Sequence, residues 1–82
     1  MAVHDLKTLP NYFKAVETGK KNFEVRSTND RTFKVGDRVH LHEFEANKQQ
    51  YTGKMLSRRI TYVLSEFEGL APGYVCFGIE PI

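Results

Sequence analysis

The sequence lacks several features that would place the protein in a membrane or in an oxidising compartment. It has no run of about 18 apolar residues, so no membrane-spanning helix is expected. Cys76 is the only cysteine among the 82 residues, which excludes an intrachain disulfide and fits a reducing compartment. The first five residues do not show the charged-then-apolar pattern of a signal peptide. We therefore expect a cytoplasmic protein with no membrane contact.

The chain also has little that suggests a cofactor or a second domain. It contains no phosphate-cradling glycine loop, no dinucleotide-binding fingerprint, no internal repeat and no linker. A chain of 82 residues buries only roughly 60–65% of the surface that its unfolded form exposes, so there is room for one core. Hydrophobic residues make up 40% and charged residues 27%, as in ordinary globular proteins. We expect one domain over residues 1–82 and no cofactor.

Charge is unevenly distributed although the net charge is only +2. Basic residues gather at positions 20–21, 26–34 and 54–59, and acidic residues gather at 43–45 and 66–68. Such sorting can produce a positive face that attracts a polyanion. It is equally consistent with solvated turns and strand edges. The charge pattern alone leaves both interpretations open.

The spacing of apolar residues predicts one helix near the N-terminus, over residues 9–18. Thr8 is a suitable N-cap, and Gly19 follows the helix as its terminator. Four apolar side chains recur at i, i+3, i+4 and i+7 and form one face that should pack on the rest of the protein: Leu9, Tyr12, Phe13 and Val16.

Short alternating segments predict strands over residues 4–6, 23–27, 38–44, 55–64 and 74–82, with 51–53 starting the return arm of a hairpin. In segment 55–64, Ile60, Tyr62 and Leu64 should share one face. One helix beside several short strands favours an α+β fold built as a small β-barrel. Six residues are expected in its core: Val39, Leu41, Ile60, Val75, Phe77 and Ile79.

The segment between the helix and the next strand is the most informative. Gly19, Lys21, Glu24 and Arg26 form a Gly-x-Lys-x-x-Glu-x-Arg pattern. This pattern resembles the signature of the ASCH family, named from the activating signal cointegrator, in the PUA-like superfamily. Residues 33–37 resemble the family's turn into its next strand, and residues 4–7 resemble the first strand of short bacterial and phage ASCH-like proteins. The resemblance covers nearly the whole chain.

This resemblance implies a PUA-like β-barrel of about five to six strands with one main helix after the first strand. It also implies that the protein binds RNA or a nucleotide in a basic cleft. A lysine at position 21 can reach into such a cleft, and Glu24 and Arg26 lie two residues apart on one strand face. A guanidinium suits a phosphate or a base edge, and Glu24 could orient it. The alternative is a surface ion pair that contributes little.

The other residues proposed for the binding site are Lys7 and Lys20, as part of a basic rim, and Tyr74, as a ring on which a base could stack. Tyr12, Tyr51 and Tyr62 are further candidates for stacking, but the periodicity of Tyr12 and Tyr62 favours the core. The sequence does not indicate the oligomeric state.

An enzymatic alternative comes from the same resemblance. Some small ASCH proteins are similar to amidohydrolases that deacetylate acetylcytidine through a Lys–Thr–Glu set. Lys21 matches the lysine, but Glu24 stands where the threonine would be, and a carboxylate cannot simply replace a hydroxyl nucleophile. Glu80 is a candidate for the glutamate. Binding without catalysis is therefore the favoured interpretation.

A metal site is not expected from the sequence. His40 and His42 alternate along one strand and share a face, but a site needs three or four ligands. His4 is the only other histidine, and nothing in the sequence places it nearby. Cys76 is interpreted as a small buried side chain.

Overall fold

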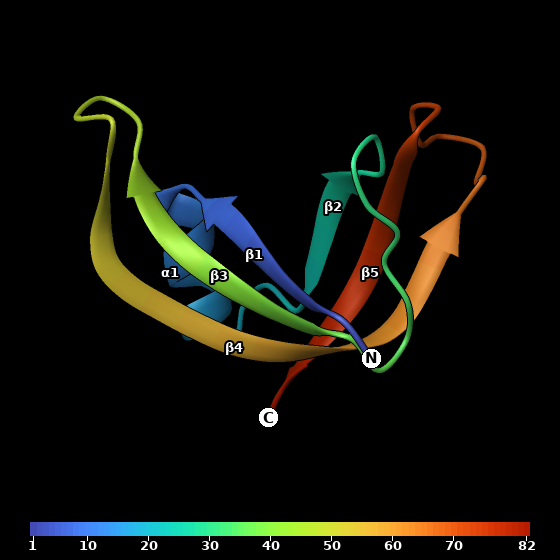
Figure 1. The fold of residues 1–82 in the computed structure, drawn as a ribbon, viewed down its shortest axis with the longest axis horizontal. Helices are drawn as coiled ribbons and strands as arrows, with labels where there is room; N and C mark the ends of the chain where they lie inside the picture. The colour runs from blue at the N-terminus through green and yellow to red at the C-terminus, as the bar shows by residue number, and fades with distance from the viewer.

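The computed structural model describes residues 1–82 and contains one helix and one five-stranded sheet (Figure 1). The elements are β1 Val3–Thr8, α1 Pro10–Glu17, β2 Phe23–Ser27, β3 Arg38–Glu45, β4 Gln50–Ser65 and β5 Tyr74–Pro81. The strand order is β1-β3-β4-β5-β2, with β1 and β3 parallel and the other pairs antiparallel. The only helix is far too short to cross a membrane.

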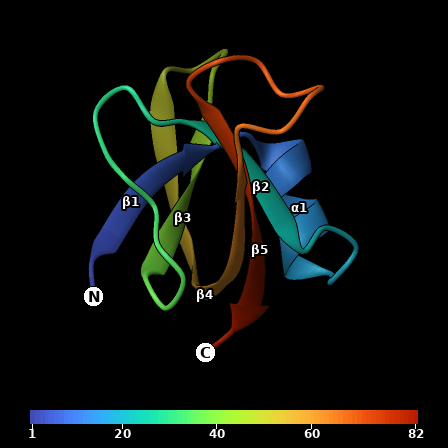
Figure 2. The same ribbon diagram turned by 90° about the vertical axis from the view of Figure 1, so that its right-hand side faces the viewer.

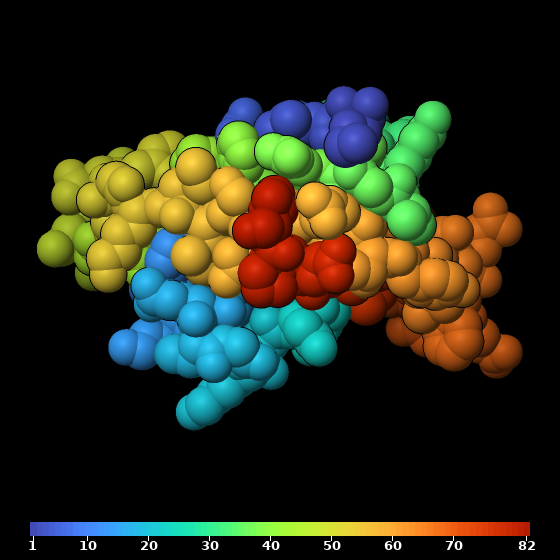
Figure 3. Space-filling model, turned by 90° about the horizontal axis from the view of Figure 1, so that it is seen from below, coloured from blue at the N-terminus to red at the C-terminus, as the bar shows by residue number.

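The sheet curls into a half-barrel whose two edges are β1 and β2 (Figures 1 and 2). Seen from below, β4 crosses the middle of the molecule, with β1 on one side and α1 on the other (Figure 3). The expected α+β class, with one helix after the first strand, is confirmed. The two edge strands do not pair with each other, so the barrel is open along one seam.

The core lies on the inner face of this curled sheet. All six residues predicted for it are buried. Val16 of α1, Leu6 of β1 and Phe33, from the segment between β2 and β3, complete the cluster. Phe13 is also buried, so two of the four residues on the predicted helix face serve the core. The helix thus packs on the sheet through its Phe13 and Val16 side chains.

The start of the helix differs from the prediction. The helix begins at Pro10 with Leu9 as its N-cap, and no side chain caps it. Thr8 is instead the last residue of β1, and its hydroxyl accepts a hydrogen bond from Arg26. Tyr12 was expected in the core but is half exposed, because α1 turns only its Phe13 side inwards. Both differences place polar and aromatic groups at the seam.

A β-bulge in β4 overturns another prediction. The pairing with β5 passes from Ile60↔Ile79 to Tyr62↔Gly78, so one extra residue, Thr61, sits between two paired positions. The extra residue reverses the side-chain alternation, and Tyr62 therefore faces solvent while Ile60 is buried. A Cβ at Gly78 would lie 2.6 Å from the Thr61 hydroxyl oxygen, so a larger residue there would require the Thr61 side chain to shift.

A buried carboxylate fixes the turn that leads into β3. Asp37 accepts hydrogen bonds from the amides of Ala2 and Lys34 at 3.0 and 3.1 Å, and its Oδ2 lies 2.9 Å from His4 Nε2. Burial opposes ionisation of this carboxyl, but the hydrogen bonds from His4 and the two amides outweigh it and lower its pKa below 3.8. His4 therefore belongs to the interior of the fold.

Candidate functional site

The open seam between β1 and β2 is bridged by one side chain. Arg26 of β2 donates from Nη1 to the carbonyl oxygen of Lys7 at 2.9 Å and from Nη2 to the Thr8 hydroxyl at 3.2 Å. Both acceptors belong to β1. A guanidinium with five donors in a fixed plane can make such a connection while it also binds a carboxylate. The residue that the sequence assigned to ligand binding thus also holds the two edges together.

Glu24 lies at the centre of this arrangement. Its side chain is on the buried face of β2 and the residue is only 3% exposed. One carboxylate oxygen accepts from Arg26 Nε and Nη2 at 3.0 and 2.8 Å, and the other accepts from Lys21 Nζ. The Lys21 ammonium also donates to the carbonyl of Phe23 at 2.8 Å. The three charged residues of the signature therefore form one connected network, as their spacing suggested.

A cavity of about 640 Å³ opens beside this network, between the end of β1, the start of α1 and β2. This volume lies within the range of small-molecule sites, which is roughly 300–1,000 Å³. Four of the ten lining residues are basic and one is acidic, so positive charge prevails. The lining residues are Lys7, Thr8, Leu9, Tyr12, Lys20, Lys21, Phe23, Glu24, Val25 and Arg26. We refer to this cavity as the seam cleft.

Two aromatic rings border the seam cleft. Tyr12 of α1 and Phe23 of β2 are both partly exposed, and their ring centroids lie 5.7 and 5.1 Å from the Lys21 ammonium. A cation at this range is attracted to the ring faces. The sequence analysis favoured the core for Tyr12 because of its helical periodicity, and it did not consider Phe23 for the site. The nearness of Phe23 to Lys21 in the sequence, and the place of Tyr12 on the preceding helix, could have indicated that both rings lie near the cleft.

Not every residue predicted for the site lies there. Tyr74 lines a separate cavity of about 360 Å³ instead, together with residues of the loop before β5. Glu80, considered for the enzymatic alternative, does not line the seam cleft and pairs with Arg59 at 3.4 Å. Thr8 brings a hydroxyl into the cleft, but that hydroxyl accepts from the Arg26 guanidinium, which cannot serve as its base.

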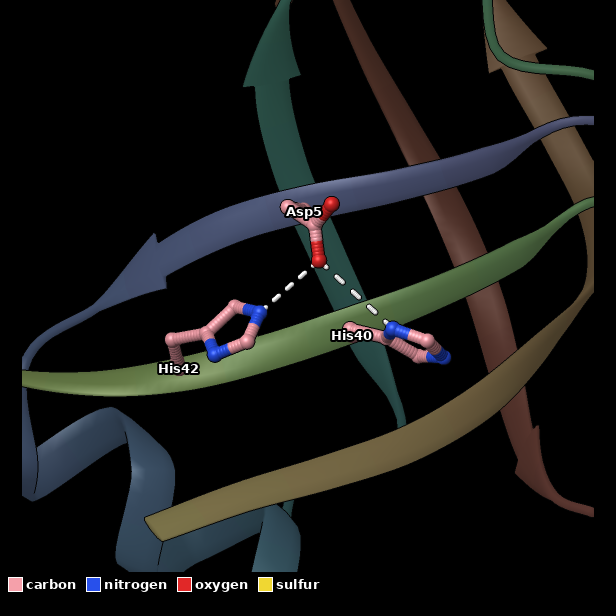
Figure 4. A group of neighbouring side chains, drawn as sticks. All are labelled: Asp5, His40 and His42. Atoms are coloured by element: carbon pink, nitrogen blue, oxygen red, sulfur yellow. Dashed lines mark hydrogen bonds and ion pairs between the residues drawn. The ribbon is translucent and has the colours of Figure 1, made fainter. Parts of the chain in front are cut away.

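A second group of polar side chains lies on the outer face of β1 and β3. Asp5, His40 and His42 place their ligand atoms within 4.8 Å of one another (Figure 4). The pKa of Asp5 is lowered from 3.8, mainly by its hydrogen bond with His42, with desolvation acting against it and the charges of both histidines acting with it. The sequence analysis predicted that the two histidines share a face but did not predict the acid, because Asp5 comes from a neighbouring strand.

Comparison with known proteins gives a family. The family described as "Domain of unknown function (DUF3850)" matches residues 3–79, which is nearly the entire chain. No curated protein matches the sequence. The match begins at the first residue of β1 and ends within β5, so it includes every strand and the seam cleft. The chain belongs to the DUF3850 family.

Proposed function

We propose that the protein binds RNA or a nucleotide in the seam cleft, as a PUA-like domain related to the ASCH family. The observation that carries the proposal is the combination of prevailing positive charge and two exposed aromatic rings around one cavity of ligand size. Cations serve the phosphate groups of a nucleotide, and rings provide a surface on which a base can stack. The Gly-x-Lys-x-x-Glu-x-Arg pattern supports the relation to ASCH domains.

The contacts suggest a division of roles within the cleft. The hydrogen bonds of Arg26 use four of its five N–H groups, so this side chain has little capacity left for a phosphate. Lys21 donates two hydrogen bonds and keeps one N–H, and Lys20 is exposed at the rim. We therefore assign phosphate contacts to Lys20 and Lys21, and assign Glu24 and Arg26 to holding the cleft in shape.

The aromatic contact is assigned to Tyr12 and Phe23. Both rings are partly exposed at the cleft while the core residues behind them are buried, so a base could be received without unfolding of the helix. Stacking tolerates all bases, since each has a π-face. We accordingly expect weak sequence preference and an affinity that depends on salt.

Titration of a short single-stranded RNA at two salt concentrations tests the proposal. Tyr12→Ala should cost about 1–3 kcal/mol of binding free energy if one base stacks on this ring. Lys20→Ala should weaken binding and reduce the salt slope by about 0.7, the value for one phosphate of a single strand. Lys34→Ala is the matched control, because Lys34 is exposed and does not line the cleft.

The same titration with a nucleoside monophosphate separates a one-nucleotide site from an RNA groove. Equal affinity for the monophosphate and the RNA would indicate that the cavity alone carries recognition. The proposal fails if wild type binds neither ligand, or if the Tyr12 and Lys20 variants bind as tightly as the Lys34 variant.

A further inference from the structure

The outer face of the β1–β3 pair gathers three metal-ligating side chains from two strands. Because alternate residues of a strand share a face, His40 and His42 both point outward from β3. β1 runs parallel to β3 with Asp5 opposite His40, so the Asp5 carboxylate projects from the same face. The carboxylate lies between the two imidazoles (Figure 4).

The distances are close to those that a metal ion requires. Asp5 Oδ1 is 2.8 Å from His42 Nε2 and 3.5 Å from His40 Nδ1, and all three ligand atoms lie within 4.8 Å of one another. Zinc bonds of about 2.0–2.2 Å in a tetrahedron correspond to ligand atoms roughly 3.3 Å apart. The three side chains are partly exposed, and small rotations would bring the two imidazoles to that separation.

We propose that Asp5, His40 and His42 form a binding site for a divalent transition-metal ion such as Zn²⁺. Two imidazoles and one carboxylate are the donor set of open sites, in which three protein ligands leave further positions for water. Ca²⁺ and Mg²⁺ prefer oxygen ligands in larger number, so the two nitrogens select against them. The ion would be held at the surface of the sheet with at least one exchangeable position.

The charged neighbours limit the strength of this site. Lys7 is opposite His42 in the strand register, and its ammonium lies 4.2 Å from the centroid of the Phe44 ring. Across β3, the residues opposite His40 and His42 are the uncharged Ser57 and Met55 of β4. The guanidinium of Arg31 also lies near the ligands, since its Nη1 donates to the Asp5 carbonyl oxygen at 3.3 Å. Both cations oppose a dication, and removal of the Lys7 charge by Lys7→Met should therefore raise the affinity for zinc.

The site is independent of the proposed nucleotide cleft. None of its three ligands lines the seam cleft, and their side chains point away from the core face that carries Glu24. The remaining histidine, His4, is buried and paired with Asp37, so it is not available as a fourth ligand. Failure of RNA binding would thus leave the metal proposal standing, and the reverse also holds.

Competition between the untagged full-length protein and a chromophoric zinc chelator tests the proposal, with zinc chloride as the probe. Wild type should bind one equivalent of zinc, and calcium or magnesium in excess should not displace it. His40→Ala, His42→Ala and Asp5→Asn should each raise Kd by more than about tenfold. Even the loss of a residue that only hydrogen-bonds to a metal ligand lowers metal affinity by about 10–100-fold. Asp30→Asn is the control, because Asp30 is an exposed acid outside the cluster.

Thermal unfolding with and without zinc provides a second readout that does not depend on the chelator. Zinc should raise Tm of wild type and of Asp30→Asn but not of the three ligand variants, because only a ligand bound to the folded state stabilises it. The absence of zinc binding by wild type would overturn the proposal. Equal binding by wild type and His42→Ala would also overturn it, since the ion would then lie elsewhere.

Discussion

Two carboxylates of the molecule are equally buried but have opposite surroundings. Glu24 and Asp37 are each 3% exposed. Asp37 is held by two backbone amides and one buried imidazole. Glu24 is held by the side chains of Lys21 and Arg26, whose charged groups remain partly accessible beside an open cavity. Asp37 is thus surrounded by backbone and buried donors, whereas Glu24 is covered by two long, partly exposed side chains.

This contrast separates a structural centre around Asp37 from the proposed binding cleft around Glu24. Two of the donors around Asp37 are backbone amides and the third is the buried imidazole of His4, so none of them can turn away freely. The ammonium of Lys21 can turn towards solvent or towards a ligand at low cost, because it stands on a flexible stem. Burial alone therefore does not indicate the role of an acid, and the kind of groups that hold it has to be considered as well.

The largest effect is expected for Asp37→Asn. The amide keeps the size of the carboxyl, but its NH₂ group must face at least one donor that now has no acceptor. We expect a loss of about 2–4 kcal/mol in the free energy of unfolding, as for other broken buried polar networks. Urea unfolding measures it. A loss in the free energy of unfolding no greater than that of Glu24→Gln would show that the Asp37 network is not a structural centre.

A smaller effect is expected for Glu24→Gln, the matched change at the cleft. Lys21 can swing into water, and Arg26 keeps its contacts with β1. We expect a loss of about 1–2 kcal/mol in the free energy of unfolding. The net positive charge of the cleft rises by one, so affinity for single-stranded RNA at low salt should increase a few-fold. Reduced affinity would instead mean that the carboxylate takes part in ligand recognition.

The smallest effect is a difference in acid stability. The pKa of Asp37 is below 3.8 in the folded protein, so the unfolded chain binds the proton more readily. This carboxyl therefore stabilises the fold fully above pH 3.8, and its contribution is lost as the pH falls through the folded pKa. Urea midpoints measured between pH 5 and 2 should fall less steeply for Asp37→Asn than for wild type. An equally steep fall of the urea midpoint with pH in both proteins would contradict the lowered pKa of Asp37.

The sequence predicted the order of the helix and the strands and most of the core residues. Alternation along β3 and β5 predicted the burial of Val39, Leu41 and Phe77, because side chains of a strand point to opposite faces. It failed at Tyr62, where the bulge at Thr61 reverses the alternation. A bulge leaves little trace in a single sequence, since it depends on how two strands pair.

In the candidate site, only contacts between residues close together in the sequence could be predicted. Lys21, Glu24 and Arg26 lie within six residues, and their network follows from the spacing. The link from Arg26 to β1 and the approach of Asp5 to the two histidines depend on strand order, which the sequence did not give. That Tyr74 lines a separate cavity and not the seam cleft also depends on strand order.

The strand order also has a consequence for synthesis on the ribosome. β3, β4 and β5 follow one another and form an antiparallel meander of local pairings, whereas β1 and β2 add to its outer edges. The N-terminal third supplies all ten residues of the seam cleft. Because β2 pairs only with β5, this part of the chain leaves the ribosome well before the strand that it pairs with. Non-local pairings of this kind form late. We therefore expect the seam cleft to form only after the final strand has emerged.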